Sequence, residues 1–152
     1  MITIAKAYNN FIDLFKAMQS VTEKALDETA DYIHNLIQDF VNQWYADYDP
    51  TQYQRTFQLL NCVTRTHIRK IGDKRKVYIY LDTAQLNYNT DTQGVLEAAN
   101  NGLHGSIYNH FEDGNTHYRL WSDGVQEIEN NELLFKAFED FMKQHGINIK
   151  RI

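Results

Sequence analysis

The sequence predicts a single α+β domain that spans residues 1–152. Three observations support this fold class. Apolar residues recur at a helical period through the N-terminal third, the period changes to two after Cys62, and a second helical stripe lies near the C-terminal end. The resulting order of helices, hairpin, helix, weak strands, helix and strand is typical of α+β folds rather than of repeated βαβ units. We therefore expect a long N-terminal amphipathic helix and a C-terminal helix to pack on a small, mostly antiparallel sheet.

The composition is that of an ordinary globular domain. Hydrophobic residues make up 43% of the 152 residues and charged residues 23%. The single cysteine, Cys62, lies in an apolar run, which excludes an internal disulfide and fits a reducing compartment such as the cytosol. No apolar run approaches the roughly 18 to 20 residues of a membrane helix, and residues 1–11 lack the layout of a signal peptide. We expect no membrane partner.

The N-terminal third predicts one long amphipathic helix over residues 21–48. Its apolar or small residues follow spacings of four and three: Leu26, Ala30, Ile33, Ile37, Phe40 and Trp44. Such a helix is on the order of 40 Å long, which exceeds what one small domain needs for its own core. We therefore expect a neighbouring subunit to cover part of its apolar face. Residues 10–18 predict a separate short helical segment, and residues 1–20 are expected to be able to move relative to the domain.

The stretch QWYADYDPTQYQRTFQLL, residues 43–60, predicts a joint between two helices. Pro50 pushes the residue before it out of helical geometry and suits the first turn of a new helix. Asp49 can cap that second, short helix, whose apolar stripe we expect to be Tyr53, Phe57 and Leu60. The residues of this structural joint, to which we assign no chemistry, are Trp44, Asp49, Pro50, Tyr53, Arg55, Thr56 and Phe57.

From Cys62 to Leu81, alternation with a period of two predicts a β-hairpin that turns at residues 72–74. The predicted inner face carries Ile68, Val77, Ile79 and Leu81. The predicted outer face is basic and aromatic, and consists of Arg65, His67, Arg69, Lys76, Tyr78 and Tyr80. Three interpretations of the outer face stay open: a solvated sheet surface, a contact surface for protein, and a nucleic-acid-binding module in which residues 65–76 follow a phosphate backbone.

The elements after the hairpin have weaker signals. Asn130 or Asn131 can cap a final helix, and Gly146 is a typical residue just beyond a helix end. The other predicted elements are a long loop over 82–94, a short helix over 95–100, mixed strand and loop over 102–121, and an edge strand over 147–152.

Catalytic chemistry has little support in the sequence. His104, His110 and His117 are of a residue type that binds zinc, but their spacing matches no metal-site signature. The chain contains no GxSxG elbow, phosphate loop or dinucleotide fingerprint, and Cys62 is expected to be buried rather than activated. We therefore predict a protein that is not an enzyme and has no catalytic residues, cofactor or metal. A metal-dependent nuclease that uses the three histidines is the alternative.

Charge is arranged in blocks around a net charge of -5. Residues 21–50 hold seven acids and one base, residues 51–80 hold seven bases and one acid, and residues 81–132 hold nine acids and one base. Such blocks predict separate positive and negative surfaces. This arrangement suits head-to-tail contact between like subunits or a partner of defined polarity.

Several segments, taken in order, resemble the tail-completion proteins of long-tailed phages and prophages, also called head-tail joining or neck proteins. These segments are FIDLFKAM, a long helix ending near WYADYDP, YQRTFQLLNCV, a basic hairpin, GLHG, and a terminal helix closing at HGI. More narrowly, the chain is similar to a prophage branch of that family from low-GC Gram-positive bacteria. In the wider family a Thr-Gly-x-Leu-Arg-x-Ser-like segment follows the long helix. Here residues 53–61 stand in that place without the Thr-Gly pair.

The resemblance implies a structural virion protein that acts at the head-tail interface and has no catalytic residues. It implies self-association into a ring, expected to be a hexamer, between the phage connector and the tail-tube proteins. A ring through which DNA passes could turn the basic hairpin toward its lumen and make non-specific DNA contacts. We accordingly expect the protein in the virion and, during assembly, in the cytoplasm of a bacterial host.

Overall fold

A computed structural model describes most of the chain. For residues 105, 106, 110 and 111 it describes the backbone alone. The described residues are 10–47, 57–88, 91–102, 105–106, 110–111 and 119–149.

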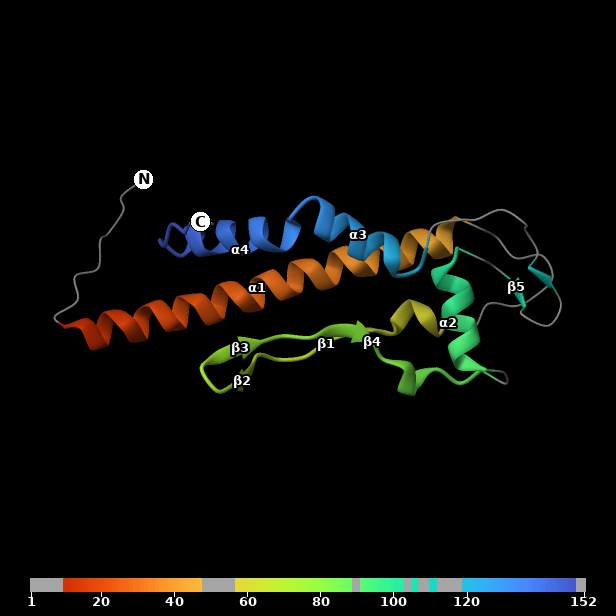
Figure 1. Ribbon diagram of the computed structural model, residues 1–152, viewed down its shortest axis with the longest axis horizontal. Helices are drawn as coiled ribbons and strands as arrows, with labels where there is room; N and C mark the ends of the chain where they lie inside the picture. The colour runs from red at the N-terminus through yellow and green to blue at the C-terminus, as the bar shows by residue number, and fades with distance from the viewer. Residues whose placement is uncertain are drawn as a thin grey trace.

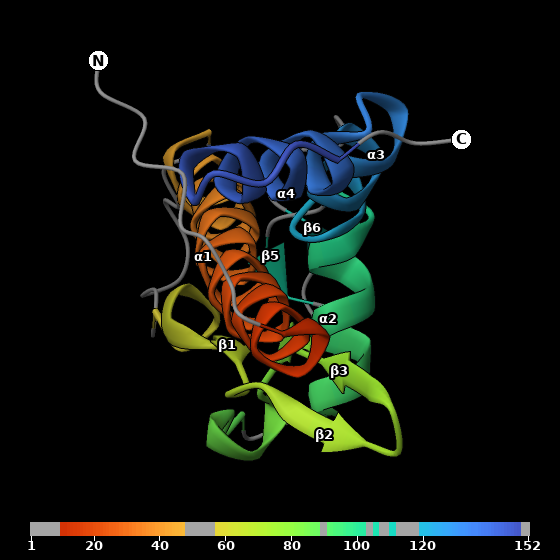
Figure 2. The same ribbon diagram turned by 90° about the vertical axis from the view of Figure 1, so that its left-hand side faces the viewer.

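The structure is built around one long helix. Helix α1 (Phe11–Ala46) forms the middle layer, with α3 (Ser122–Asn130) and α4 (Leu133–Gln144) along one side and the strands β1 to β4 along the other (Figure 1). The end view shows the same three layers, with α2 (Thr92–Asn100) beside them (Figure 2). The described helices and antiparallel strand pairs confirm the predicted α+β fold class.

Helix α1 is one continuous element of 36 residues, which corrects the prediction of a separate helical segment over residues 10–18. Its N-cap is Asn10, whose side-chain oxygen accepts a hydrogen bond from the backbone N–H of Asp13 at 2.9 Å. Neither glycine nor proline occurs between residues 10 and 47, so no strong helix breaker separates the two predicted segments. The helix ends at Ala46 rather than at the predicted Tyr48.

The core lies where α1 meets the 3-10 turn η1 (Leu59–Asn61), the hairpin and helices α2 and α3. Leu120, in the segment just before α3, is fully buried there. Gly124 of α3 is also buried, and a Cβ at this position would lie 3.1 Å from the Phe40 ring, so the glycine allows α3 to approach α1 closely. The buried residues of α1 are Ala25, Thr29, Ala30, Ile33, Ile37, Val41 and Trp44.

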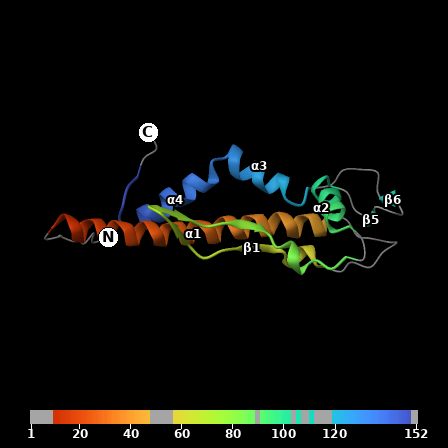
Figure 3. The ribbon, with the colours of Figure 1, turned by 60° about the horizontal axis from the view of Figure 1, so that its bottom comes forward.

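The predicted hairpin is present and runs along α1 (Figure 3). Its proximal part pairs β1 (Val63–Arg65) with β4 (Ile79–Leu81), and its distal part pairs β2 (Arg69–Ile71) with β3 (Lys74–Lys76). Both pairs are antiparallel. Gly72, in the turn between β2 and β3, has a φ of 59°, a left-handed conformation that glycine adopts without strain.

The register of the hairpin changes by one residue at its middle. Three residues of the outgoing strand, 66–68, lie opposite two of the returning strand, 77–78, which is the arrangement of a β-bulge. The extra residue inverts the alternation of the outgoing strand, so Arg65 faces α1 whereas Arg69 is exposed. The paired residues on either side of the bulge are Val63–Leu81, Thr64–Tyr80 and Arg65–Ile79, then Arg69–Lys76, Lys70–Arg75 and Ile71–Lys74.

The segment between the hairpin and α3 contains more regular structure than predicted. The predicted loop over 82–94 includes a 3-10 turn, η2 (Thr83–Gln85), and the first turn of α2. Asp91 caps α2, and its side chain accepts a hydrogen bond from the Gln93 backbone N–H at 3.0 Å. Two short strands, β5 (Gly105–Ser106) and β6 (His110–Phe111), pair with each other. They lie within residues 102–121, for which the sequence predicted a mixture of strand and loop.

The C-terminal part contains two helices where the sequence predicted one. Helix α3 was not predicted, and Glu132 in the turn between α3 and α4 has a left-handed φ of 52°. The predicted stop at Gly146 is confirmed: its φ is 86°, and the Ile147 N–H donates to the Met142 carbonyl at 2.9 Å, as in a Schellman motif. Residues 147–149 are not a strand, so the predicted edge strand is wrong over the described part of 147–152.

Candidate assembly surfaces

The N-terminal turns of α1 extend past both α4 and the tip of the hairpin (Figure 1). We call residues 11–18 the α1 overhang. At about 100° per residue its large apolar side chains fall within an arc of about 160° and form one face of the helix. A face of this kind is typical of an interaction surface. The exposed fractions are 77% for Phe11, 64% for Ile12, 58% for Phe15, 46% for Met18 and 36% for Leu14.

The overhang continues the buried stripe of the same helix. From Phe15 and Met18, spacings of three and four lead along one face to Ile33 in the core. The rings of Phe11 and Phe15 stack on each other, with centroids 6.4 Å apart. In the body of the protein α4 and the hairpin cover this stripe, whereas no other described element covers the overhang. The neighbouring subunit that we expect to cover part of the apolar face of residues 21–48 stays a prediction.

A row of carboxylates on α1 holds the hairpin in place. Glu23, Asp27 and Asp31 are four residues apart, so they lie along one face of the helix. The Arg65 guanidinium contacts both Asp27 and Asp31, with nitrogen–oxygen distances of 2.7 Å. Farther along the hairpin, Arg75 Nε lies 2.5 Å from Glu23 Oε1. Both arginine side chains are largely covered. The four-residue repeat of acids is the sequence signal that could have revealed this contact.

The predicted position of Arg65 on the outer face of the hairpin is wrong. Arg65 pairs with Ile79 and lies on the face that packs against α1, where only 20% of its side chain is exposed. The hydrogen bond to Asp27 raises the pKa of the Arg65 guanidinium. Arg65 therefore attaches the hairpin to α1 and is turned away from any outside partner.

The other five residues predicted on the outer face are exposed. Tyr78 and Tyr80 each retain 43% exposure. Arg69 and Lys76 pair across the distal strands and are exposed, and His67 is exposed at the bulge. These side chains are available for contact with protein or DNA, and either contact stays a prediction. The four residues predicted on the inner face are all half-buried: Ile68, Val77, Ile79 and Leu81.

The ion pair between Arg75 and Glu23 predicts a pH-dependent contribution to stability. The Arg75 hydrogen bond lowers the pKa of the Glu23 carboxyl below its ordinary value of 4.5. A carboxyl with a lowered folded-state pKa stabilises the fold above its unfolded-state pKa, and this stabilisation is lost as the pH falls through the folded-state pKa. We expect Arg75→Gln to reduce the free energy of unfolding at neutral pH, and the difference from wild type to shrink as the pH falls below about 4.5.

Chemical unfolding of both proteins between neutral pH and pH 3 measures this difference in the free energy of unfolding. Lys76→Gln is the matched control, because the Lys76 side chain is exposed on the neighbouring position and makes no ion pair in the described part of the chain. If the difference in the free energy of unfolding between Arg75→Gln and wild type stayed constant across the acidic range, the pair with Glu23 would not stabilise the fold.

On the other side of α1, a histidine side chain contacts a glutamate of this helix. His145 Nε2, just beyond α4, lies 2.6 Å from Glu28 Oε2 of α1. This contact joins the C-terminal end of α4 to the same stretch of α1 that holds the hairpin. The carboxylates of residues 23–31 thus fasten both outer layers to the central helix.

The predicted joint is described only at its two ends. Trp44 is buried and packs edge-on against Tyr45, with ring centroids 4.9 Å apart. Phe57 stacks on Tyr45 at 5.4 Å and has a left-handed φ of 55°. Tyr45, which the sequence analysis did not single out, is therefore the ring that links the two ends. Outside the described residues lie Asp49, Pro50, Tyr53, Arg55 and Thr56.

The histidine hypothesis falls mostly on undescribed parts of the chain. His104 and His117 lie outside the described residues, and His110 lies in β6, where the backbone alone is described. Within the described side chains, no three histidine, cysteine, aspartate or glutamate residues are grouped so that they could hold a metal ion. Cys62 is fully buried, and burial raises the pKa of its thiol to about 11. Its thiol is therefore protonated at neutral pH and is a poor nucleophile.

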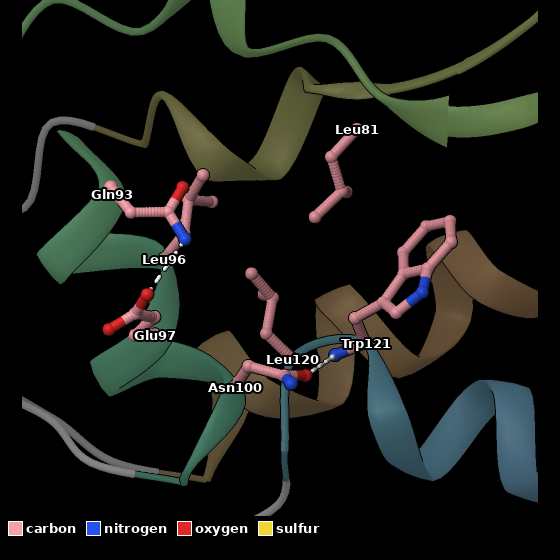
Figure 4. Close-up of a pocket in the computed structure, with 7 residues that line it drawn as sticks. All are labelled: Leu81, Gln93, Leu96, Glu97, Asn100, Leu120 and Trp121. Carbon is pink, nitrogen blue, oxygen red and sulfur yellow. Dashed lines mark hydrogen bonds between the residues drawn. The ribbon is translucent and has the colours of Figure 1, made fainter.

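A small pocket of about 190 Å³ lies between α2 and the start of α3 (Figure 4). It is smaller than the roughly 300–1,000 Å³ of typical ligand pockets. At its edge the Asn100 side-chain oxygen accepts hydrogen bonds from the backbone N–H groups of Trp121 and Ser122, at 3.1 and 2.9 Å. Asn100 thereby caps α3 from a different helix. The pocket residues are Leu81, Gln93, Leu96, Glu97, Asn100, Leu120 and Trp121.

Comparison with known families adds what the geometry alone does not provide. The model of the YomN family matches residues 10–144, which include every described helix and strand. The chain belongs to the YomN family. This is a family derived from Bacillus phages and prophages, so the YomN-family chain is a phage-related protein.

The other comparisons gave no matches: neither a curated protein nor a solved structure resembled the YomN-family chain significantly. The match covers the α1 overhang, the hairpin and both C-terminal helices, so both candidate surfaces lie within the family region. Among the described residues, no helix is both long enough and apolar enough to cross a membrane.

Proposed function

We propose that this chain is a structural component of a phage particle that acts at the head-tail interface as a tail-completion or neck protein, and that it is not an enzyme. The observation that carries the proposal is the α1 overhang, with Phe11, Ile12 and Phe15 each more than half exposed. Membership in a phage-derived family supports a place in the particle or its assembly. The ordered resemblance of segments to tail-completion proteins supports the head-tail interface in particular.

The overhang supports an assembly role because its apolar side chains contribute little stability while they are exposed to water. Burying one side chain such as Phe or Met against a partner contributes about 1.5–3 kcal/mol. A helix end held in place but left uncovered gives up this stabilisation, unless a partner supplies the missing surface. In the proposed role the partners are further copies of the chain, in a ring that is expected to be hexameric, and the connector and tail-tube proteins of the same phage. The protein is then found in the virion and, before assembly, in the host cytoplasm.

A stop codon in the gene of the parental phage tests the role. We expect lysates that contain DNA-filled heads and separate tails, seen by electron microscopy, because joining is the step that fails. Expression of the wild-type chain in the host should restore joined particles. Normal tailed particles that lack the protein would contradict the proposal, and empty heads would assign the protein to an earlier step.

Complementation with variants of the overhang links the role to the structure. Phe11→Ser with Phe15→Ser is expected to fold, because both side chains are largely exposed, yet to reduce the yield of joined particles by about tenfold or more. Tyr32→Ser is the matched control, since Tyr32 is a 42%-exposed aromatic residue farther along the same helix. Full complementation by the overhang variant would remove the observation on which the proposal rests.

A further inference from the structure

We propose that the hairpin tip of one copy binds the turn between α3 and α4 of a second copy, in a head-to-tail contact. The basic tip, residues 69–76, contains five bases and one acid, and the acidic turn, residues 127–132, contains three acids and no base. The inference rests on the self-association that forms part of the proposed function, and it names the two surfaces that meet.

The basic tip presents free cations on the side that faces away from α1. Arg75 is turned toward α1 and is held by Glu23, so its strand neighbours Lys74 and Lys76 point the other way. Arg69 pairs across the hairpin with Lys76, and Ile71 pairs with Lys74. In the described part of the chain none of these three bases has an ion-pair partner, and Ile71 is 48% exposed between them.

The acidic turn offers the opposite charge around a similar apolar centre. Glu127 and Glu129 are exposed in the last turn of α3, where carboxylates interact unfavourably with the helix dipole. Glu132 follows in the turn, and Leu134 at the start of α4 is 57% exposed. A bound cationic surface would relieve the repulsion at this helix end. Glu127 and Glu129 therefore have a physical reason to bind bases, and neither makes an ion pair in the described part of the chain.

The two surfaces lie in different layers of the molecule. The tip belongs to the hairpin layer and the turn to the helical layer on the opposite side of α1 (Figures 1 and 2). One copy therefore cannot join its own tip to its own turn. Because the tip and the turn are different patches, the contact between copies is heterologous, and it gives a ring where the rotation closes. Each patch has an exposed aliphatic residue, Ile71 or Leu134, inside a charged rim of opposite sign, which is the usual anatomy of an interface.

Charge reversal on each surface tests the contact. In sedimentation experiments at low ionic strength, Lys74→Glu with Lys76→Glu and Glu127→Lys with Glu129→Lys should each weaken self-association by about tenfold or more. An equimolar mixture of the two variants should restore it, because every tip then meets a turn of opposite charge. One chain that carries all four substitutions should also self-associate. Added salt should weaken the wild-type contact.

Equal charge changes elsewhere provide the controls. Lys24→Glu with Lys143→Glu and Asp39→Lys with Asp140→Lys alter exposed positions outside the overhang, the tip and the turn, and should leave self-association unchanged. Failure of the mixture to restore association would overturn the proposal. So would a wild-type chain that stays monomeric at millimolar concentration, even if the phage still needs the protein to join heads and tails. A tip variant that loses affinity for duplex DNA while self-association is unaffected would assign the tip to nucleic acid instead.

Discussion

Replacement of Leu120 by alanine is expected to lower the free energy of unfolding by about 2–5 kcal/mol. The Leu120 side chain is fully buried in the cluster that joins α1, α2 and the hairpin, and its backbone N–H donates to the Ala99 carbonyl at 3.1 Å. The substitution removes apolar contacts and leaves a cavity that this tightly connected region can fill only partly. Denaturant unfolding of the two proteins measures the effect.

Leu134→Ala is the matched control for this experiment. The same atoms are removed, but Leu134 is 57% exposed in the described chain, so the expected change is within about 0.5 kcal/mol. Equal effects of the two substitutions would mean that Leu120 is not part of the core. A loss at Leu134 alone would indicate that Leu134 is covered in solution, as it would be in the head-to-tail contact.

Replacement of Asn100 by alanine is expected to destabilise the chain by about 2 kcal/mol, because backbone groups lose their hydrogen-bond acceptor. The Asn100 oxygen accepts a hydrogen bond from the Trp121 N–H, which Figure 4 shows, and another from the Ser122 N–H. The Asn100 amide nitrogen also lies 2.7 Å from Ser122 Oγ. Trp121, the local N-cap of α3, makes no capping hydrogen bond with its own side chain. The first turn of α3 thus depends on a residue of α2.

Asn100→Asp separates this role from simple packing. The carboxylate keeps the acceptor, and its charge is favourable at the start of α3 and unfavourable at the end of α2, so most of the stability should be retained. Gln93→Ala, on the exposed first turn of α2, should have little effect. If the alanine and aspartate variants at position 100 were equally destabilised, the capping explanation would be wrong.

The main elements of the fold could be predicted because they depend on local periodicity. The stripe that includes Ile33, Ile37 and Trp44 identifies the long helix, and Gly146 identifies the end of the last one. Helix α3 escaped prediction because the side chain that caps its start, Asn100, is distant in sequence. Its Gly124 also lowers helix propensity, and the reason for that glycine, close approach to Phe40, exists only in the folded chain.

The residue types on the candidate surfaces could be predicted from the sequence, but the directions in which their side chains point could not. The basic, aromatic character of the hairpin is evident from alternation, and residues such as Tyr78 and Tyr80 are exposed as expected. The position of Arg65 was missed because the bulge shifts the register and because the attraction of Asp27 and Asp31 depends on tertiary packing. The overhang was not predicted, because residues 10–18 were expected to form a separate segment and surplus length was expected only for residues 21–48. Periodicity does not tell which part of a helix its own chain will cover.

The extra residue in the outgoing strand of the hairpin has a consequence for how this surface could change in evolution. Deletion of one residue from 66–68 would leave two residues opposite 77–78, so alternation with a period of two would run unbroken from Arg65 to Arg69 and the distal strand pair would keep its present faces. Arg69 would still point outward opposite Lys76, and Lys70 would still lie on the α1 side opposite Arg75. The bulge could therefore be lost in a single deletion while the hairpin presents the same charged groups and the core beneath it keeps its packing.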